Sequence, residues 1–359
     1  MNNLNWTIEV FIILISLGPL TFAVYITFSE YLKDKYRHNL FMMLIWLMVM
    51  IIDILIIISN LILSPTLYLY SMFLWILSAI FISLLFDSVS RESIDPKKLI
   101  IISILSTAIG FFSFDPNAVV YNYFPNGEIG LLMGGNFRII ISILFLFISG
   151  MYAFYTLKIH WKAPKNLKLY SSINLFGGIA VVGSVIIVLI GLNKIIPRID
   201  FLTVAIGGLF MAIAFAKEPR LAYILPFKLM RLTVIDTKSG ISIFTHDWKT
   251  GETLVDESLF SGMLHGISAI LNEAVGKGNV LGILLDKALL IIKRNEEYPI
   301  ACVLIATKSN KSLRQALNSF SEKFISEFSR FFSETSLVSN FEPASSLILE
   351  CFPFVPEYD

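Results

Sequence analysis

The sequence predicts a multi-pass α-helical membrane protein, in which a seven-helix bundle precedes a cytoplasmic α+β domain. Of its 359 residues, 56% are hydrophobic and only 15% are charged, whereas ordinary soluble domains have about 45–50% and about 25%. The charges are also uneven, because 23 lie within residues 1–216 and 32 within residues 217–359. We therefore expect the first part in lipid and the second in water. This composition argues against a wholly soluble chain, a disordered chain and a basic nucleic-acid-binding protein, so no nucleic-acid partner is expected.

Seven apolar stretches approach the length that a helix needs to cross a bilayer, roughly 17–25 residues. The first begins without a preceding Lys or Arg and is too long for the apolar part of a cleaved signal peptide, so we expect it to remain as an anchor. The predicted spans are residues 6–28, 40–63, 67–90, 99–114, 136–158, 169–192 and 201–216.

Basic residues predict how these spans are oriented, because Lys and Arg accumulate in short cytoplasmic loops. With the N-terminus outside, the cytoplasmic loops 29–39, 91–98 and 158–168 carry ten Lys and Arg, whereas the outer side carries three. The sequence therefore predicts a cell-membrane protein with its C-terminal domain in the cytoplasm.

The outer loop 115–134 is expected to form a β-hairpin. Asn126-Gly127 favours a two-residue turn with positive φ angles, and the apolar stretches on both sides can pair as strands. Two interpretations are open: the hairpin only caps the bundle, or it is a lid over an outward-facing ligand pocket. In the second case Tyr121, Tyr123 and Phe124 form its aromatic face.

Asp53 is the one unambiguous charge inside a predicted span, where charged side chains are costly and mark functional sites. Trp46 and Asn60 lie seven residues to either side on the same helical face, so Asp53 is expected to face the bundle interior. A layer of serines at similar depth is expected to hydrogen-bond its carboxylate: Ser16, Ser78, Ser142 and Ser184. Asp53 then either joins helices by hydrogen bonds or senses a ligand or a proton. The candidate ligand-binding residues are Asp53, Asn60, Tyr121, Tyr123 and Phe124.

Other membrane functions find less support in the sequence. The last span, residues 201–216, has no lysine to which retinal could be attached, and no inverted repeats with broken helices indicate a secondary transporter. Gly177-Gly178 and Gly207-Gly208 are typical of closely packed helices.

After Leu232 the pattern predicts an antiparallel sheet covered by helices, in the order ββαβββα. The expected strands are 232–236, 241–248, 281–286, 288–293 and 300–306. One helix is expected to begin at Asp256 and end before Gly276, and a second to run over residues 309–332 with its apolar side chains on one face.

The domain shows no catalytic pattern. It has no glycine-rich phosphate loop, no nucleophile elbow and no Cys/His metal spacing, so we expect neither an enzyme, a cofactor nor a metal. Cys302 is expected to be a buried apolar side chain, while His246 and His265 are expected at a strand end and a helix flank. Residues 333–359 form an acidic tail that we expect to dock on the domain itself.

Residues 230–332 resemble the longin and roadblock group of profilin-like domains. The resemblance rests on the element order and on the strand-turn-strand sequence VIDTKSGISIF. A PAS domain would instead place several short helices between the second and third strands. The resemblance implies a small GTPase, or another longin- or roadblock-type protein, as a partner.

Residues 1–225 resemble the seven-span N-terminal region of certain membrane histidine kinases. The features that carry the resemblance are RHNLF at 37–41, the hairpin loop with Asn-Gly, and IIPRID at 195–200. Such regions are sensory inputs. The chain departs from the kinases after Ala216, because neither His246 nor His265 is followed by the residues of a phosphoacceptor box, and no room is left for an ATP-binding domain.

The sequence thus favours a non-catalytic, receptor-like sensor whose bundle is coupled to a protein-binding domain through a short link. A transporter or channel with Asp53 as its coupling site, and a simple membrane tether, are the alternatives. The lipid bilayer is the expected surrounding of the bundle, and a homodimer is left open.

Overall fold

The computed structural model divides the chain into two compact units, one of residues 1–88 and 93–222 and the other of residues 223–359 with residues 89–92. The structure describes residues 4–34, 37–90, 95–123, 127–190, 192, 196–224, 228–248, 262, 263, 266, 282–286, 288–295, 297–309, 311–332 and 338–355. Most of the expected helix between Asp256 and Gly276, including His265, lies outside these residues.

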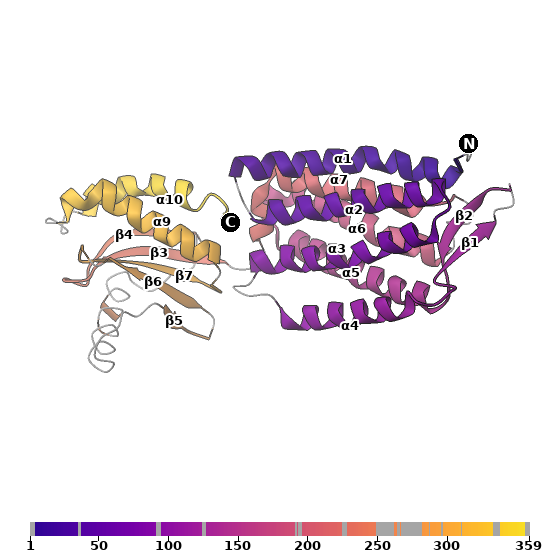
Figure 1. Cartoon of the computed structure of the whole chain (residues 1–359). Coiled ribbons are helices and arrows are strands. Elements are labelled where there is room, and N and C mark those ends of the chain that lie inside the picture. The colour runs from indigo at the N-terminus through magenta and orange to yellow at the C-terminus, as the bar shows by residue number, and fades with distance from the viewer. Residues whose placement is uncertain are drawn as a thin grey trace. The chain divides into compact units, whose positions relative to one another are not determined.

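The first unit is built from long apolar helices that lie side by side (Figure 1). They are α1 (Ile8–Asp34), α2 (Arg37–Leu61), α3 (Pro65–Ser90), α4 (Pro96–Phe112), α5 (Gly135–Lys162), α6 (Lys168–Leu189) and α7 (Ile199–Lys217), and the short 3₁₀ helix η1 (Lys165–Leu167) precedes α6. Such helices satisfy their own backbone hydrogen bonds, as a lipid environment requires.

Six of these helices are long and apolar enough to cross a membrane: α1, α2, α3, α5, α6 and α7. The fourth predicted span, residues 99–114, corresponds to α4, which has 17 residues. At 1.5 Å per residue it is about 26 Å long, shorter than the roughly 30 Å hydrocarbon core. The described residues therefore indicate a multi-pass membrane protein with six candidate spanning helices, and α4 is too short to be counted among them.

The glycine pairs lie where helix backbones meet, as the sequence predicts. A Cβ atom added to Gly177 would lie 2.6 Å from the backbone oxygen of Gly207, and one added to Gly208 would lie 2.6 Å from the ring of Trp46. These close approaches bring α6 against α7 and α7 against α2.

The predicted hairpin is confirmed as strands β1 (Val119–Tyr123) and β2 (Ile129–Met133), which pair antiparallel with Tyr121 opposite Leu131. The two-residue turn is wrong. Tyr123 lies opposite Ile129, so five residues connect the strands. Gly127 has the expected positive φ of 84°, while Phe124 and Asn126 lie outside the described residues.

The second unit contains one antiparallel five-stranded sheet in the order β4-β3-β7-β6-β5. Its strands are β3 (Leu229–Asp236), β4 (Ser242–Asp247), β5 (Gly282–Leu284), β6 (Leu289–Arg294) and β7 (Ile300–Ala306), close to the predicted ranges. All seven residues of β7 are buried, as expected of a central strand with both faces covered.

Helix α9 (Lys311–Phe328) and helix α10 (Ser345–Cys351) lie on one face of this sheet (Figure 1). The apolar stripe predicted for α9 is buried at Leu313, Leu317, Phe320, Phe324 and Phe328. The 3₁₀ helices η4 (Ser329–Phe331) and η5 (Val338–Ala344) complete the unit, and η3 (Pro219–Tyr223) lies at the boundary between the two units along the chain.

The C-terminal tail packs on this unit, as predicted. The fully buried Phe341 ring stacks 5.8 Å from Phe324, and the Phe352 ring lies 5.4 Å from Trp248. Lys323 of α9 also forms an ion pair with Glu350 of the tail.

Candidate functional site

Asp53 lies on the interior face of α2, as the sequence predicts. Its side chain is 1% exposed, and Trp46 and Asn60 on the same face are 1% and 0% exposed. The hydroxyl of Ser16 on α1 lies 2.7 Å from its Oδ2 atom. The Oδ1 atom is buried and makes no hydrogen bond within the described residues. A buried carboxyl group with a single hydrogen-bond partner is costly when ionised.

The predicted serine layer is wrong except at Ser16. Ser78, Ser142 and Ser184 donate instead to carbonyl oxygens of their own helices, at Leu74, Arg138 and Val181. Serine inside a helix bonds readily to the carbonyl three or four residues earlier, because the backbone holds this acceptor within reach. Similar depth in the bundle is therefore not sufficient to bring a serine to Asp53.

Asn60 attaches the hairpin to α2. Its Oδ1 atom accepts a hydrogen bond of 3.0 Å from the backbone N–H of Leu131 in β2, and its Nδ2 atom donates to the carbonyl of Ile56. Seven residues separate Asn60 from Asp53, which is about 10.5 Å along a helix. The two side chains therefore belong to different levels of the bundle.

The tyrosines of β1 do not close over a pocket. Tyr121 and Tyr123 lie on the same face of the strand and are 49% and 74% exposed. The Tyr121 hydroxyl donates a long hydrogen bond, 3.4 Å, to the carbonyl of Leu63. Because these rings face outward and Asn60 holds the backbone of β2, the structure does not bring the four described site residues together in one cavity; the fifth, Phe124, lies outside the described residues.

A buried ion pair at the same end of the helices was missed by the sequence analysis. Glu9, in the first turn of α1, is 3% exposed and lies with its Oε1 atom 3.2 Å from Nε of Arg198, which is 7% exposed. Arg198 immediately precedes α7 and has the left-handed φ of 59°. The sequence signal for this pair is an acidic residue beside the hairpin-side end of the first span and a basic residue beside that of the last span.

Arg198 also holds the hairpin. Its Nη2 atom donates to the carbonyl of Leu131 at 2.7 Å and to the hydroxyl of Tyr68 on α3 at 3.4 Å. Leu131 in β2 therefore has its N–H bonded to α2 and its C=O bonded to the residue before α7. A charge-assisted hydrogen bond in a buried place is stronger than an ordinary one.

Two further contacts join α1 to the hairpin. Asn5 donates from Nδ2 to the carbonyls of Asn60 and Ile129, and the N–H of Ile8 donates to the carboxylate of Glu128. We call Asn5, Glu9, Asn60 and Arg198 the hairpin anchor. Its members come from the starts of α1 and α7 and from the end of α2.

A second polar cluster lies at the opposite ends of α3, α4 and α5. Lys98 of α4 forms an ion pair with Asp87 of α3, which is 2% exposed, and donates to the Tyr155 hydroxyl of α5 at 3.2 Å. The backbone N–H of Asp95 donates to the other oxygen of Asp87 at 2.8 Å. This cluster fixes the start of the short helix α4 to its neighbours.

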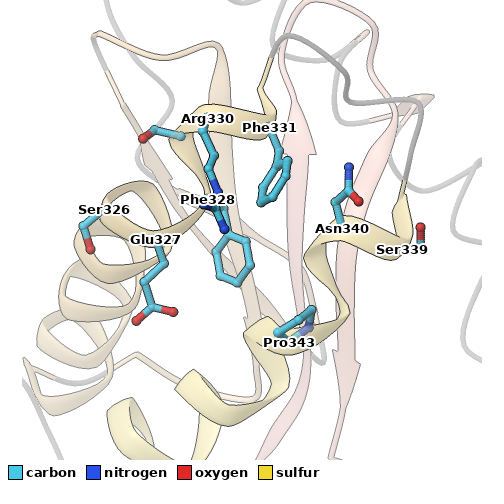
Figure 2. Close-up of a pocket in the computed structure, with 9 residues that line it drawn as sticks. Ser326, Glu327, Phe328, Arg330, Phe331, Ser339, Asn340 and Pro343 are labelled. Carbon is cyan, nitrogen blue, oxygen red and sulfur yellow. The ribbon is translucent and has the colours of Figure 1, made fainter.

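A hollow of about 710 Å³ lies in the sheet unit where α9 and η4 meet η5. In the view of Figure 2, the rings of Phe328 and Phe331 lie between Glu327 and Arg330 on one side and Asn340 and Pro343 on the other. The guanidinium of Arg330 lies 4.6 Å from the centre of the Phe331 ring, an arrangement favoured by cation–π attraction.

The described Cys and His side chains of the sheet unit are buried or packed against neighbours. Burial raises the pKa of Cys302 to about 12, and it also raises the pKa of Cys351. The ring of His246 packs edge-on against Trp248 at 4.7 Å. Within the described residues, no three His, Cys, Asp or Glu side chains are grouped to hold a metal ion.

The helical unit therefore contains buried polar groups, and those of the hairpin anchor fix the hairpin to the first and last helices. Comparison of the chain with known protein families, with curated proteins and with solved structures gave no match.

Proposed function

We propose that this chain is a non-catalytic membrane sensor, in which the bundle receives a signal and a cytoplasmic protein-binding domain reports it. The hairpin anchor is the observation that supports this proposal. Arg198 bonds the hairpin at the Leu131 carbonyl and directly precedes α7. Since α7 is the last long helix before β3, a displacement of the hairpin acts on the start of the element that leads to the sheet unit.

In this proposal the hairpin faces the outside of the cell and the sheet unit lies in the cytoplasm. The basic loops support this orientation, because ten Lys and Arg follow or precede the helix ends opposite the hairpin and three lie on the hairpin side. The proposal also includes α4 as a seventh span.

The proposed output is recognition of a small GTPase or of another longin- or roadblock-type domain. The succession of β3 and β4, then β5, β6 and β7, then α9, supports it, because this is the element order on which the resemblance rests. The helix expected between β4 and β5 would complete that order. A second copy of the chain is the other partner that the resemblance suggests.

The test uses the full chain in lipid nanodiscs and purified small GTPases loaded with GDP or with a non-hydrolysable GTP analogue. We expect capture to depend on the nucleotide, and to change in Arg198→Lys. Lysine keeps the positive charge opposite Glu9, but it lacks the forked guanidinium group with which arginine donates to two acceptors at once.

Ser142→Ala is the matched control, because Ser142 bonds only the carbonyl of Arg138 on its own helix among the described contacts. Capture that is the same for the parent chain, for Arg198→Lys and for a fragment beginning at residue 229 would contradict coupling and favour a simple tether.

The buried Asp53 favours one second candidate, a transporter or channel that uses this carboxyl group as its coupling site. A flux assay in proteoliposomes compares the parent chain with Asp53→Asn. Absence of flux in the parent chain rejects this candidate, whereas flux that Asp53→Asn abolishes supports it.

A further inference from the structure

We propose that Asp53 is a proton-binding site, in which the carboxyl group carries a proton on Oδ2 and donates it to the Ser16 hydroxyl. This inference deepens the proposed function and rests on it, because it names the hydrogen ion as the input to the bundle. It is carried by the hydrogen-bond geometry around Ser16.

Ser16 has a single hydroxyl proton for two short oxygen–oxygen contacts. Its Oγ atom lies 2.6 Å from the carbonyl oxygen of Ile13 and 2.7 Å from Oδ2 of Asp53. A hydroxyl group donates one proton and accepts through its lone pairs, whereas a backbone carbonyl can only accept. If Ser16 donates to Ile13, the second short contact is a hydrogen bond only when Asp53 provides the proton.

The surroundings of Asp53 offer no compensation for a negative charge. Its Oδ1 atom makes no hydrogen bond within the described residues. The helices packed on α2 include α1, which presents Ser16, and α7, whose Asp200 acts on Asp53 as a like charge. The buried cation Arg198, at the start of α7, is engaged by Glu9. A neutral carboxyl group removes the cost of an isolated charge.

In this proposal the proton enters from the hairpin side. Asp53 lies eight residues before Leu61, the hairpin-side end of α2, which corresponds to about 12 Å. Asp200, the second residue of α7, is partly exposed and interacts with both Arg198 and Asp53. On binding, an O–H bond forms at Oδ2 with a proton from water, and on release the same bond breaks and the carboxylate remains. No other bond changes.

Loss of this proton would change the contact between α1 and α2. With Asp53 ionised, Oδ2 and the Ile13 carbonyl compete for the single proton of Ser16, and one short oxygen–oxygen contact becomes repulsive. The charge is also placed beside Asp200. The packing of α1 and α7 on α2 therefore depends on whether Asp53 holds its proton.

Infrared difference spectroscopy on the full chain in lipid nanodiscs tests the site. At neutral pH we expect the carbonyl stretching band of a protonated carboxylic acid that is lost in Asp53→Asn. In Ser16→Ala the band should remain and shift to higher frequency, because the acid loses its acceptor. Equal spectra of the parent chain and Asp53→Asn, or a band that Ser16→Ala leaves unmoved, would overturn the proposal. Ser142→Ala is the control and should leave the band in place.

A second measurement tests the path. In proteoliposomes of known protein orientation, alkaline medium on the hairpin side should remove the Asp53 band, whereas alkaline medium on the other side should not. The opposite result would overturn entry from the hairpin side. Because the band is measured without a partner protein, its absence rejects the proton site alone, and partner capture that ignores the bundle rejects the proposed sensor alone.

Discussion

The ion pair of Glu9 and Arg198 shows how one residue controls the hairpin. Both side chains are nearly inaccessible to solvent, and the guanidinium also serves the Leu131 carbonyl. Breaking a buried pair by removing one partner leaves an uncompensated charge, which costs about 3–5 kcal/mol, whereas removing both charges costs much less.

We therefore expect Arg198→Gln to destabilise the full chain by about 3 kcal/mol or more, and Glu9→Gln combined with Arg198→Gln to recover part of this loss. Thermal unfolding in nanodiscs measures the stability, and hydrogen exchange of residues 129–133 reports the hairpin. A double variant that is as unstable as the sum of the two single variants would show that the charges do not interact.

Cys302 predicts a pH dependence of the sheet unit. Burial raises its pKa to about 12, whereas an unfolded thiol titrates near about 8.5. Between these values the unfolded chain releases a proton that the folded chain keeps, so stability falls as pH rises, by up to about 1.4 kcal/mol per pH unit. Denaturant unfolding should show this decline above about pH 9, and Cys302→Ala should flatten it. A decline of the same slope in Cys302→Ala would assign it to other groups.

Sequence reasoning recovers some site residues and misses others for a physical reason. Asp53 is found because it is a lone charge in an apolar stretch, and its burial is confirmed. Glu9 and Arg198 are missed because charges near the ends of spans are usually solvated. Only the fold of the hairpin over the helix ends buries them, and this contact joins residues more than 180 positions apart.

At the scale of helices, small residues set the distances. Gly178 lies against Thr156 of α5 and Gly208 against Trp46 of α2, whereas a Cβ atom added to Gly183 meets nothing within 4 Å. The glycines of one helix therefore have different roles that the sequence alone does not separate.

We expect Gly208→Ala to lower the thermal stability, since the added methyl group would overlap the Trp46 ring and overpacking costs about 1–3 kcal/mol. Gly183→Ala is the matched control, and it should leave the stability unchanged or raise it by up to about 1 kcal/mol, because alanine is the better helix former. The melting temperatures of both variants in nanodiscs decide this. Equal losses would show that α6 and α7 tolerate alanine equally.

The C-terminal tail behaves as an element of the sheet unit. Phe341 is fully buried among the rings of Phe324, Phe328 and Phe332, while Leu349 of α10 is 72% exposed. Phe341→Ala should cost about 3–5 kcal/mol, as for other buried aromatic side chains, and Leu349→Ala should cost less than about 0.5 kcal/mol. Denaturant unfolding of the full chain, followed by the reactivity of its two cysteines, Cys302 and Cys351, which are both buried in the sheet unit, measures both. A small effect of Phe341→Ala would show that the tail is not part of the folded core.

Element boundaries follow from the sequence where one signal dominates. Long apolar runs place the six spanning helices and alternation places the strands, to within a few residues. The predicted fourth span was too long at its end, because the chain turns after Phe112 into the hairpin loop. The length of the turn between β1 and β2 also differs from the prediction, because it depends on the register of the two strands. Pairing between the strands fixes this register, and local composition does not.

At the scale of the whole molecule, the average composition conceals two different units. The chain is 56% hydrophobic, but the helical unit exposes large apolar side chains, such as Phe111 and Phe154, while the sheet unit hides its own core. The first unit depends on lipid, and the second is built like a water-soluble domain.

Residues 223–359 should consequently fold when expressed alone. All residues of β7 are buried within this unit. The tail also packs on the start of the unit, where the ring centres of Tyr223 and Phe354 are 4.8 Å apart. Circular dichroism should show one cooperative melting transition for this fragment, and the thiol of Cys302 should react only after unfolding. A fragment of residues 223–332 is the control. It should melt at a lower temperature or fail to fold, because it lacks the Phe341 ring that fills the space beside Phe324. If both fragments melt alike, the tail does not stabilise the sheet unit; if neither folds, the sheet unit depends on the helical unit.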